Sequence, residues 1–374
     1  MKKLLQYPVT VLFFLFLFGF SLINFLTPSK AFSELENKYL AQRPAFSWKA
    51  LLDSSDKGFA QKFEKYVNEQ FPLRDGWISL KSRAESALGK IENNGIVYGR
   101  DGYLFDKYRS YDAGRLEKNL GLLERFAEKT PGLDRTLMVI PASYNLLTDK
   151  LPEGLGNIDQ IREIEAVYER ARQSGYRTVD AAAALMTHAR EEIYYRTDHH
   201  WTTDGAWYGY EAFAAAVGRQ AVRPDSALRR TSEGFWGTYF SKAKKYNAAP
   251  DTLVWYDLPV DSVTIDGSDV NGMYDLSQLE KRDRYAMFLH ANNGVTVLQN
   301  SGAPEGSILV IKDSYANCFV PFLTQSYSKV VVVDLRSMPK GLAELIHSEK
   351  IEEILVLYSF ENLASDSNFP RLLY

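Results

Sequence analysis

The chain has 374 residues and a formal net charge of −3, from 44 basic and 47 acidic residues. This length accommodates one large domain and an accessory segment, and the charge balance argues against a nucleic-acid-binding protein, which would carry a strongly basic face. The single cysteine, Cys318, excludes an intrachain disulfide and a cysteine-based zinc cluster. No motif predicts a cofactor.

An apolar stretch near the N-terminus predicts a membrane anchor. Residues 7–26 are almost all apolar, and Met1-Lys2-Lys3 precedes them. This run is long enough to cross a bilayer, and longer than the apolar region of about 7–15 residues in a signal peptide. Ser29-Lys30-Ala31 nevertheless resembles a cleavage site. Because a basic flank stays in the cytoplasm, we expect a single-pass protein of the cell membrane whose main part faces outward.

The predicted domain organisation has three parts. Residues 1–27 form the cytoplasmic tip and signal anchor. Residues 28–95 contain helical spacing of apolar residues, interrupted near Phe71-Pro72, and we interpret them as a helical stalk without chemistry of its own. Residues 96–374 form the candidate catalytic domain.

Short apolar runs alternate with helical stretches in this last part. The predicted strands are 137–140, 176–179, 308–311, 330–333 and 354–357, and the predicted helices are 161–174, 181–190 and 205–217. Continuous apolar strands alternating with helices indicate an α/β fold with a parallel sheet flanked by helices. Residues 228–299 break the rhythm with Gly, Asn, Asp and aromatic residues, so we interpret them as an excursion with some strand, close to the substrate cleft.

The stretch from Tyr194 to Trp207, YYRTDHHWTTDGAW, contains the first candidate catalytic residues. In extended backbone, residues two apart point the same way, so Asp198 and His200 share a face while His199 points elsewhere. A carboxylate beside an imidazole fixes its tautomer and stabilises the imidazolium that forms during proton transfer. We therefore predict His200 as a general base that Asp198 orients.

The stretch ILVIKDSYANCF, residues 308–319, supplies a candidate nucleophile. A predicted buried strand ends at Lys312-Asp313, and Ser314 begins what reads as a helix. A serine at a strand-to-helix turn is exposed at the carboxyl edge of the sheet, where open α/β sheets place their sites. We predict Ser314 as the nucleophile.

Other interpretations of these residues compete. His200 and Asp198 could be a buried pair that serves packing alone, and Ser314 could be an ordinary helix N-cap. A metal site is the sharper rival. Adjacent histidines rarely point at one ion from a strand, however, and the chain has no H-E-x-x-H spacing, so we predict no metal.

The motif TDHHW, residues 197–201, resembles the signature of the DHHW family, which is similar to exported alginate O-acetylation proteins with an SGNH-hydrolase-like domain. The segments VYGRDGYLF (97–105), GFWGTYFSKA (234–243) and IKDSYANCFVPFL (311–323) also look like family blocks. The resemblance implies an SGNH-like fold and the triad order Asp198, His200, Ser314. It also implies acetyl transfer to polysaccharide hydroxyls through an acetyl-serine, with a membrane-bound O-acyltransferase as the partner that delivers acetyl.

Four further residues are candidates for oxyanion or substrate binding. Asn292, in FLHANNG, lies where relatives tend to have a Gly-Gly-Asn turn, although His290 and Ala291 depart from that pattern. The backbone N–H of Tyr315 is a second oxyanion candidate. Arg336 could bind an anionic or hydroxylated substrate, although a structural ion pair is the simpler expectation. Trp201 could wall the acyl pocket.

The sequence as a whole predicts an extracytoplasmic, serine-dependent O-acetyltransferase that acts on an exopolysaccharide or cell-wall glycan. The same residues would serve a carbohydrate acetylesterase, because only the acceptor differs, water instead of sugar. A non-catalytic glycan-binding or scaffold protein of a polysaccharide export complex is the third possibility.

Overall fold

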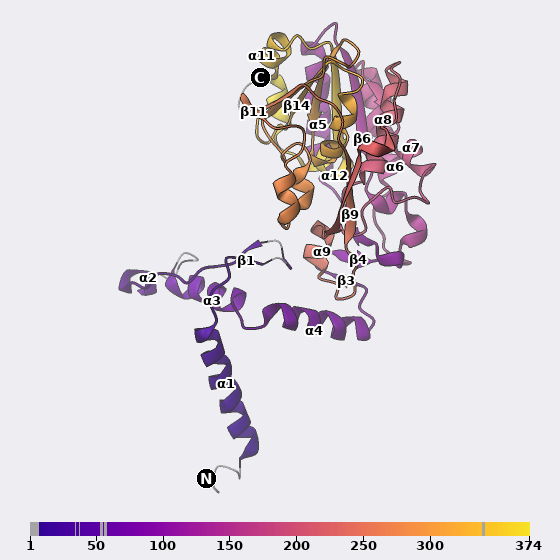
Figure 1. The fold of residues 1–374 in the computed structure, drawn as a ribbon. Coiled ribbons are helices and arrows are strands. Elements are labelled where there is room, and N and C mark those ends of the chain that lie inside the picture. The colour runs from indigo at the N-terminus through magenta and orange to yellow at the C-terminus, as the bar shows by residue number, and fades with distance from the viewer. Residues whose placement is uncertain (1–6, 34, 37, 53–54, 56–57, 339–340) are drawn as a thin grey trace. The chain divides into compact units, whose positions relative to one another are not determined.

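The computed structural model describes residues 7–33, 35–36, 38–52, 55, 58–338 and 341–374, so the basic flank Met1-Lys2-Lys3 lies outside the described residues. The chain divides into two compact units. Unit 1 comprises Met1–Asn93 with Lys244–Asn247, and unit 2 comprises Asn94–Ala243 with Ala248–Tyr374. Figure 1 labels some of the elements of each unit.

Unit 1 is mainly helical. Its elements are α1 (Pro8–Leu26), β1 (Phe32–Ser33), β2 (Lys38–Tyr39), α2 (Trp48–Leu52), α3 (Phe59–Glu69), α4 (Arg74–Ala87) and β3 (Glu92–Asn93). Helix α1 has 19 residues and a mean hydropathy of 2.4, and within the described residues it is the one helix long and apolar enough to cross a membrane. The break near Phe71-Pro72 separates α3 from α4 as predicted.

Unit 2 alternates strands and helices. Its strands are β4 (Ile96–Tyr98), β5 (Leu104–Asp106), β6 (Asp134–Ile140), β7 (Arg177–Val179), β8 (Arg229–Phe235), β9 (Asp251–Tyr256), β10 (Ser262–Ile265), β11 (Ser268–Val270), β12 (Val295–Gln299), β13 (Ser307–Lys312), β14 (Lys329–Val333) and β15 (Glu353–Ser359). Its helices are α5 (Ala113–Lys129), α6 (Gln160–Gln173), α7 (Ala181–Met186), α8 (Thr203–Ala216), α9 (Thr238–Ala243), α10 (Val320–Leu323), α11 (Leu342–Ser348) and α12 (Phe360–Ser365).

The central sheet has eight strands in the order β11-β10-β12-β14-β13-β15-β6-β7. The five strands from β14 to β7 are parallel to one another, as predicted. Strands β10, β11 and β12 extend the sheet in antiparallel pairs, so the sheet is mixed, whereas the sequence predicted a wholly parallel one. These three strands come from the excursion 228–299, which was expected to contain some strand but was not predicted to extend the central sheet.

Each central strand alternates its side chains between two cores. In β13, Ile308 and Val310 join one hydrophobic cluster, and Leu309 and Ile311 join the other. Helices α7, α8 and α10 cover the first face, and α5, α6, α11 and α12 cover the second. Burial on both faces explains why these strands are apolar without interruption. Polar residues therefore gather where the strands end, at the carboxyl edge of the sheet.

Candidate active site

Ser314 begins a short 3-10 turn, Ser314–Cys318, directly after the buried strand β13. Asp313 fixes this turn from both sides. Its Oδ1 accepts the N–H of Tyr315 (3.0 Å), and its Oδ2 accepts the N–H and hydroxyl of Ser359 (2.9 and 2.7 Å) and the side-chain amide of Asn362 (2.7 Å). The candidate nucleophile thus lies on a turn that is hydrogen-bonded, through Asp313, to the end of β15 and to α12.

The loop that carries the two histidines is a hairpin closed by an isolated bridge between Tyr194 and Trp201. Asp251, at the start of β9, anchors it by accepting the backbone N–H of Thr197 (2.9 Å) and that of Arg196 (2.9 Å). The loop is therefore attached to the β8–β9 hairpin, far away in the sequence.

Asp198, His200 and Ser314 form one hydrogen-bonded row. Asp198 Oδ1 lies 2.5 Å from His200 Nδ1, and His200 Nε2 lies 2.8 Å from Ser314 Oγ. Asp198 and His200 are 3% and 5% exposed. This order allows an imidazole to accept a hydroxyl proton at one nitrogen while a carboxylate stabilises the resulting charge at the other.

Backbone donors complete the surroundings of Asp198. Its Oδ1 accepts the N–H of His200 (3.0 Å), and its Oδ2 accepts the N–H of Thr238 at the start of α9 (2.7 Å). Although burial by itself disfavours the charge, His199, His200 and these hydrogen bonds hold the pKa of Asp198 well below its usual range. The carboxylate is therefore charged throughout the physiological range.

Gly237 makes the approach of α9 to Asp198 possible. A Cβ at this position would lie 2.3 Å from the Cβ of Asp198 and 2.5 Å from the carbonyl oxygen of Thr197. Any side chain there would push the Thr238 N–H away from the carboxylate. The block GFWGTYFSKA thus contributes to the site, although its chemistry was not predicted.

Tyr285 covers the imidazole of His200. The two rings stack with centroids 3.8 Å apart and an interplanar angle of 10°. Its hydroxyl donates to the carbonyl oxygen of Ser314 (3.1 Å) and contacts Cys318 Sγ (3.3 Å). Tyr285 therefore fixes base and nucleophile together, and no spacing in the sequence pointed to it.

His199 lies beside the row without joining it. Its ring centroid is 3.8 Å from that of His200, and its Nδ1 is 3.4 Å from Asp198 Oδ1. Burial and the neighbouring His200 lower the pKa of His199 to about 4, so its imidazole is neutral near pH 7. The sequence predicted that His199 points elsewhere, and this was wrong: its ring lies beside the same carboxylate and the same imidazole, because the loop is a tight turn and not extended backbone.

Asn292 is held by residues on both sides of Ser314. Its Oδ1 accepts from Lys312 Nζ (2.6 Å) and from the side-chain amide of Asn317 (3.3 Å). The three residues before it, 289–291, have φ values of 52°, 55° and 73°, a strained run for residues other than glycine. Both contacts fix Oδ1, and within the part of the chain that the structure describes no acceptor contacts the amide nitrogen of Asn292.

The other three predicted site residues already have partners within the folded chain. The N–H of Tyr315 is engaged by Asp313 Oδ1, so it is not a free oxyanion donor in this arrangement. Trp201 is 0% exposed and donates to the Tyr315 carbonyl oxygen (2.8 Å), so it cannot wall a pocket; its bulk belongs to the core. Arg336 forms the simpler ion pair, with Nε and Nη2 on Asp334 (2.8 and 2.5 Å).

Asp198, His199 and His200 also have metal-type ligand atoms within 4.8 Å of one another. In this arrangement, however, Asp198 engages one nitrogen of His200 and Ser314 engages the other. A metal ion would have to displace one of these partners. The geometry therefore favours proton transfer along the row.

Residues 95–333 match the family model described as DHHW protein. Curated relatives include the probable alginate O-acetylases AlgJ of Pseudomonas putida (29% identical over 174 residues, 44% of each chain) and Pseudomonas aeruginosa (28% over 174 residues, 44% of this chain and 43% of the relative). The matched region thus spans less than half the length of these relatives.

Two solved structures show the same fold. A DHHW family protein from Eubacterium siraeum superposes with a TM-score of 0.64 at 23% identity, covering 76% of this chain and 96% of the other. Bacillus cereus PatB1 with a sulfonyl adduct superposes with a TM-score of 0.59 at 21% identity, covering 73% and 97%.

Proposed function

The chain belongs to the DHHW family, and from this membership and the hydrogen-bonded row of Asp198, His200 and Ser314 we propose that it is an extracytoplasmic O-acetyltransferase acting on a polysaccharide. The row is the observation that carries the proposal. The reaction class is taken from the names of the AlgJ relatives. The proposed substrate is an exopolysaccharide or a cell-wall glycan.

The first half-reaction acylates the serine. Ser314 Oγ attacks the carbonyl carbon of the acetyl donor while His200 Nε2 takes the hydroxyl proton. The charged Asp198 stabilises the imidazolium at Nδ1. When the tetrahedral intermediate collapses, His200 gives the proton to the leaving group, and an acetyl ester remains on Ser314.

The second half-reaction repeats these roles. A sugar hydroxyl enters beside the acetyl-serine, and neutral His200 takes its proton as the oxygen attacks the ester carbon. Collapse returns the proton to Ser314 Oγ and releases the O-acetylated glycan. Atoms and charge balance over the cycle, and no metal or cofactor takes part.

We propose two N–H donors that stabilise the oxyanion in both steps. Within the described residues, nothing accepts a hydrogen bond from the N–H of Ser314, which follows the strand end. The Asn292 amide nitrogen is the second donor, because Lys312 and Asn317 hold its oxygen. Such preorganised donors are worth about 10²–10³-fold in rate each.

The acetyl group must reach the outer side of the membrane. We propose a membrane-bound O-acyltransferase as the partner that delivers it, and α1 as the anchor that keeps this chain in the same membrane. Cross-linking of the two proteins in intact cells tests this partnership.

An esterase and a scaffold remain the competing functions. Incubating the purified protein with an activated acetyl ester and candidate oligosaccharides separates the first from a transferase: we expect acetylated sugar, and free acetate alone whatever the acceptor would favour the esterase. The variant Ser314→Ala distinguishes an enzyme from a scaffold. Cells with this variant would retain glycan acetylation if the protein is a scaffold and would lose it if the protein is the enzyme.

A further inference from the structure

Unit 1 exposes an unusual number of large apolar side chains. Beyond α1, the Phe, Trp, Leu and Ile side chains at least 40% exposed are Phe46, Trp48, Leu51, Leu52, Phe63, Phe71, Leu73, Trp77, Leu80, Leu88 and Ile91. Three of them join the half-buried Phe59 and Tyr66 in a continuous series of ring contacts, Trp48–Phe46–Phe59–Phe63–Tyr66, with centroids 5.4–6.1 Å apart. Large exposed apolar patches mark surfaces that contact another apolar phase or a partner.

One side of helix α4 packs against the rest of unit 1, and the opposite side is exposed. Its Ser82 is buried and accepts the N–H of Tyr246 (3.2 Å) from the returning segment Lys244–Asn247. The opposite side carries Trp77 and Leu80, with Leu88 directly after the helix, and all three are exposed. An amphipathic helix of this kind lies with its apolar side against a core or a membrane interface.

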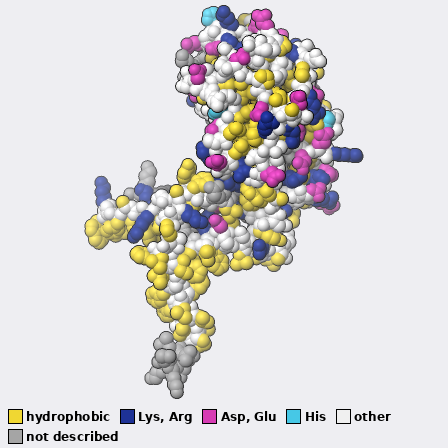
Figure 2. All heavy atoms as spheres, viewed as in Figure 1, with side chains coloured by type: hydrophobic (Ala, Val, Ile, Leu, Met, Phe, Trp, Pro, Cys, Tyr) yellow, Lys and Arg dark blue, Asp and Glu magenta, His cyan; other side chains and the backbone are white. Residues whose placement is uncertain are grey.

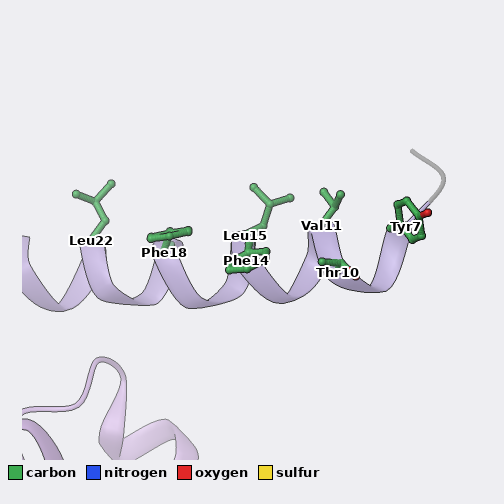
Figure 3. A pocket seen from close by; sticks show the side chains of 8 residues that line it. Tyr7, Thr10, Val11, Phe14, Leu15, Phe18 and Leu22 are labelled. Atoms are coloured by element: carbon green, nitrogen blue, oxygen red, sulfur yellow. The ribbon is translucent and has the colours of Figure 1, made fainter. Parts of the chain in front are cut away.

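The uncovered surface is continuous with α1. The ring of Phe20, in α1, stacks on Phe71 (5.6 Å) and contacts Trp77 (6.2 Å). Helix α1 is about 28 Å long at 1.5 Å per residue, close to the thickness of a bilayer core. Figure 3 shows one side of α1 from close by, with Val11, Leu15 and Leu22 pointing away from the helix. Figure 2 shows hydrophobic side chains along α1 and onto the helices at its C-terminal end.

The candidate cleavage site is built into the folded unit. The N–H of Lys30 donates to Gln70 Oε1 (2.9 Å), and Gln70 Nε2 donates back to the Lys30 carbonyl oxygen (2.8 Å). Ser29 Oγ lies 2.9 Å from the hydroxyl of Tyr66, and the Ala31 carbonyl oxygen accepts the N–H of Leu40 (3.0 Å). A peptidase needs this backbone extended and free, whereas here it is hydrogen-bonded to α3 and its surroundings.

We propose that α1 is retained in the mature protein and that α2, α3 and α4 lie in the lipid–water interface of the bilayer that α1 crosses. Tryptophan and phenylalanine are favoured at that depth, and the cations Lys49, Lys62 and Lys81 on the same helices would reach the headgroups. The partner of this surface is thus a lipid bilayer. The proposal does not depend on the chemistry of Ser314.

Tryptophan quenching in the full-length protein tests it. The protein is reconstituted in vesicles of phosphatidylcholine and phosphatidylglycerol, with ordinary or brominated acyl chains, as wild type, Trp48→Phe and Trp77→Phe. Subtracting the emission of a variant from that of the wild type gives the emission of the replaced tryptophan. For Trp48 and Trp77, this emission should be at least twofold weaker in the brominated vesicles than in the ordinary ones. Trp207→Phe is the matched control, because Trp207 is 3% exposed inside unit 2, and its emission should be unchanged by bromine.

Emission of Trp48 and Trp77 that is unaffected by bromine but quenched by aqueous iodide would overturn the interfacial placement. Retention of α1 is tested separately by the intact mass of the protein isolated from cell membranes. We expect a mass that includes residues 8–26, and a mature chain beginning near Phe32 would overturn it.

Discussion

His200 Nε2 lies 2.8 Å from Ser314 Oγ, although 114 positions separate the two residues in the chain. Strand β13 brings the serine to the carboxyl edge of the sheet, and a hairpin loop anchored by Asp251 brings the histidine to the same place. Two segments with unrelated local structure thus converge on one proton-transfer pair, which is the arrangement that the proposed chemistry needs.

The two adjacent histidines should respond differently to the same substitution. His200→Gln removes the only imidazole in contact with Ser314 within the described residues, so we expect acetyl transfer to fall by about 10³-fold or more. His199→Gln leaves the row intact and should change the rate by less than about tenfold. Steady-state rates with an activated acetyl ester measure both. Equal losses would show that the base has been assigned to the wrong ring, or that both act together.

Lys312 should act through Asn292, as a positioning residue. Lys312→Met removes the donor that holds Asn292 Oδ1. We expect kcat to fall by about 10- to 100-fold with little change in KM, because the weakened interaction stabilises the oxyanion of the transition state and not the bound substrate. Burial lowers the pKa of Lys312 to about 8, so the wild-type rate should also decline above pH 8, and the variant should lack this decline.

Lys329→Met is the control for this prediction. It has the same chemistry, but Lys329 pairs with Glu349 (3.2 Å) near the start of β14, away from Ser314. If both variants lose kcat and thermal stability in parallel, Lys312 serves the fold alone.

Glu361 should make stability depend on pH. Burial and the nearby Asp106, with a smaller opposing effect of Lys242, raise its pKa from 4.5 to about 7. Between these values the folded protein keeps a proton on Glu361 that the unfolded chain releases, so the contribution of Glu361 to the free energy of unfolding should fall as pH rises from about 4.5 to 7, by at most about 3 kcal/mol. Glu361→Gln should abolish this fall and preserve the contact with Gln160 (3.4 Å).

Denaturant titrations at pH 4.5 and pH 8 measure that difference. The variant should match the wild type at the lower pH and exceed it at the higher. Glu211→Gln, on an exposed position of α8, is the control and should follow the wild type at both. A stability difference between the wild type and Glu361→Gln that is the same at both pH values would contradict the account.

Cys318 should be inert in the folded protein. It is 1% exposed, and burial raises the pKa of its thiol to about 12, so almost no thiolate is present at neutral pH. Iodoacetamide should leave both the thiol and the activity unchanged until the protein is unfolded. Labelling of the native protein at the rate of a free thiol would bring Cys318 back as a rival nucleophile.

The parts predicted well from sequence are those whose signals are local. Strands buried on both faces are continuously apolar, so β13, β14 and β15 were predicted within two residues of their observed bounds, and the prediction 137–140 covers the C-terminal part of β6. Asp198 and His200 lie two apart in one segment, and Ser314 follows a recognisable strand end. Their mutual contact was inferred from the carboxyl-edge rule and from the family resemblance, and was not visible in either segment alone.

The parts that were missed depend on tertiary contact. Tyr285 lies over His200 from the excursion 228–299, where no periodicity marked it. The engaged N–H of Tyr315 and the complete burial of Trp201 follow from how the turn and the loop pack, which spacing does not encode. The return of Lys244–Asn247 to unit 1 is likewise a property of the folded chain.

The most direct test of the central claim is to find the covalent intermediate. The full-length protein is exposed briefly to an activated acetyl ester, quenched in acid and analysed by peptide mass spectrometry, alongside Ser314→Ala. We predict one acetyl group on the peptide that contains Ser314, formed before any acceptor is added and absent from the variant. Acetylation spread over surface lysines, equal in both proteins and without a Ser314 adduct, would contradict it.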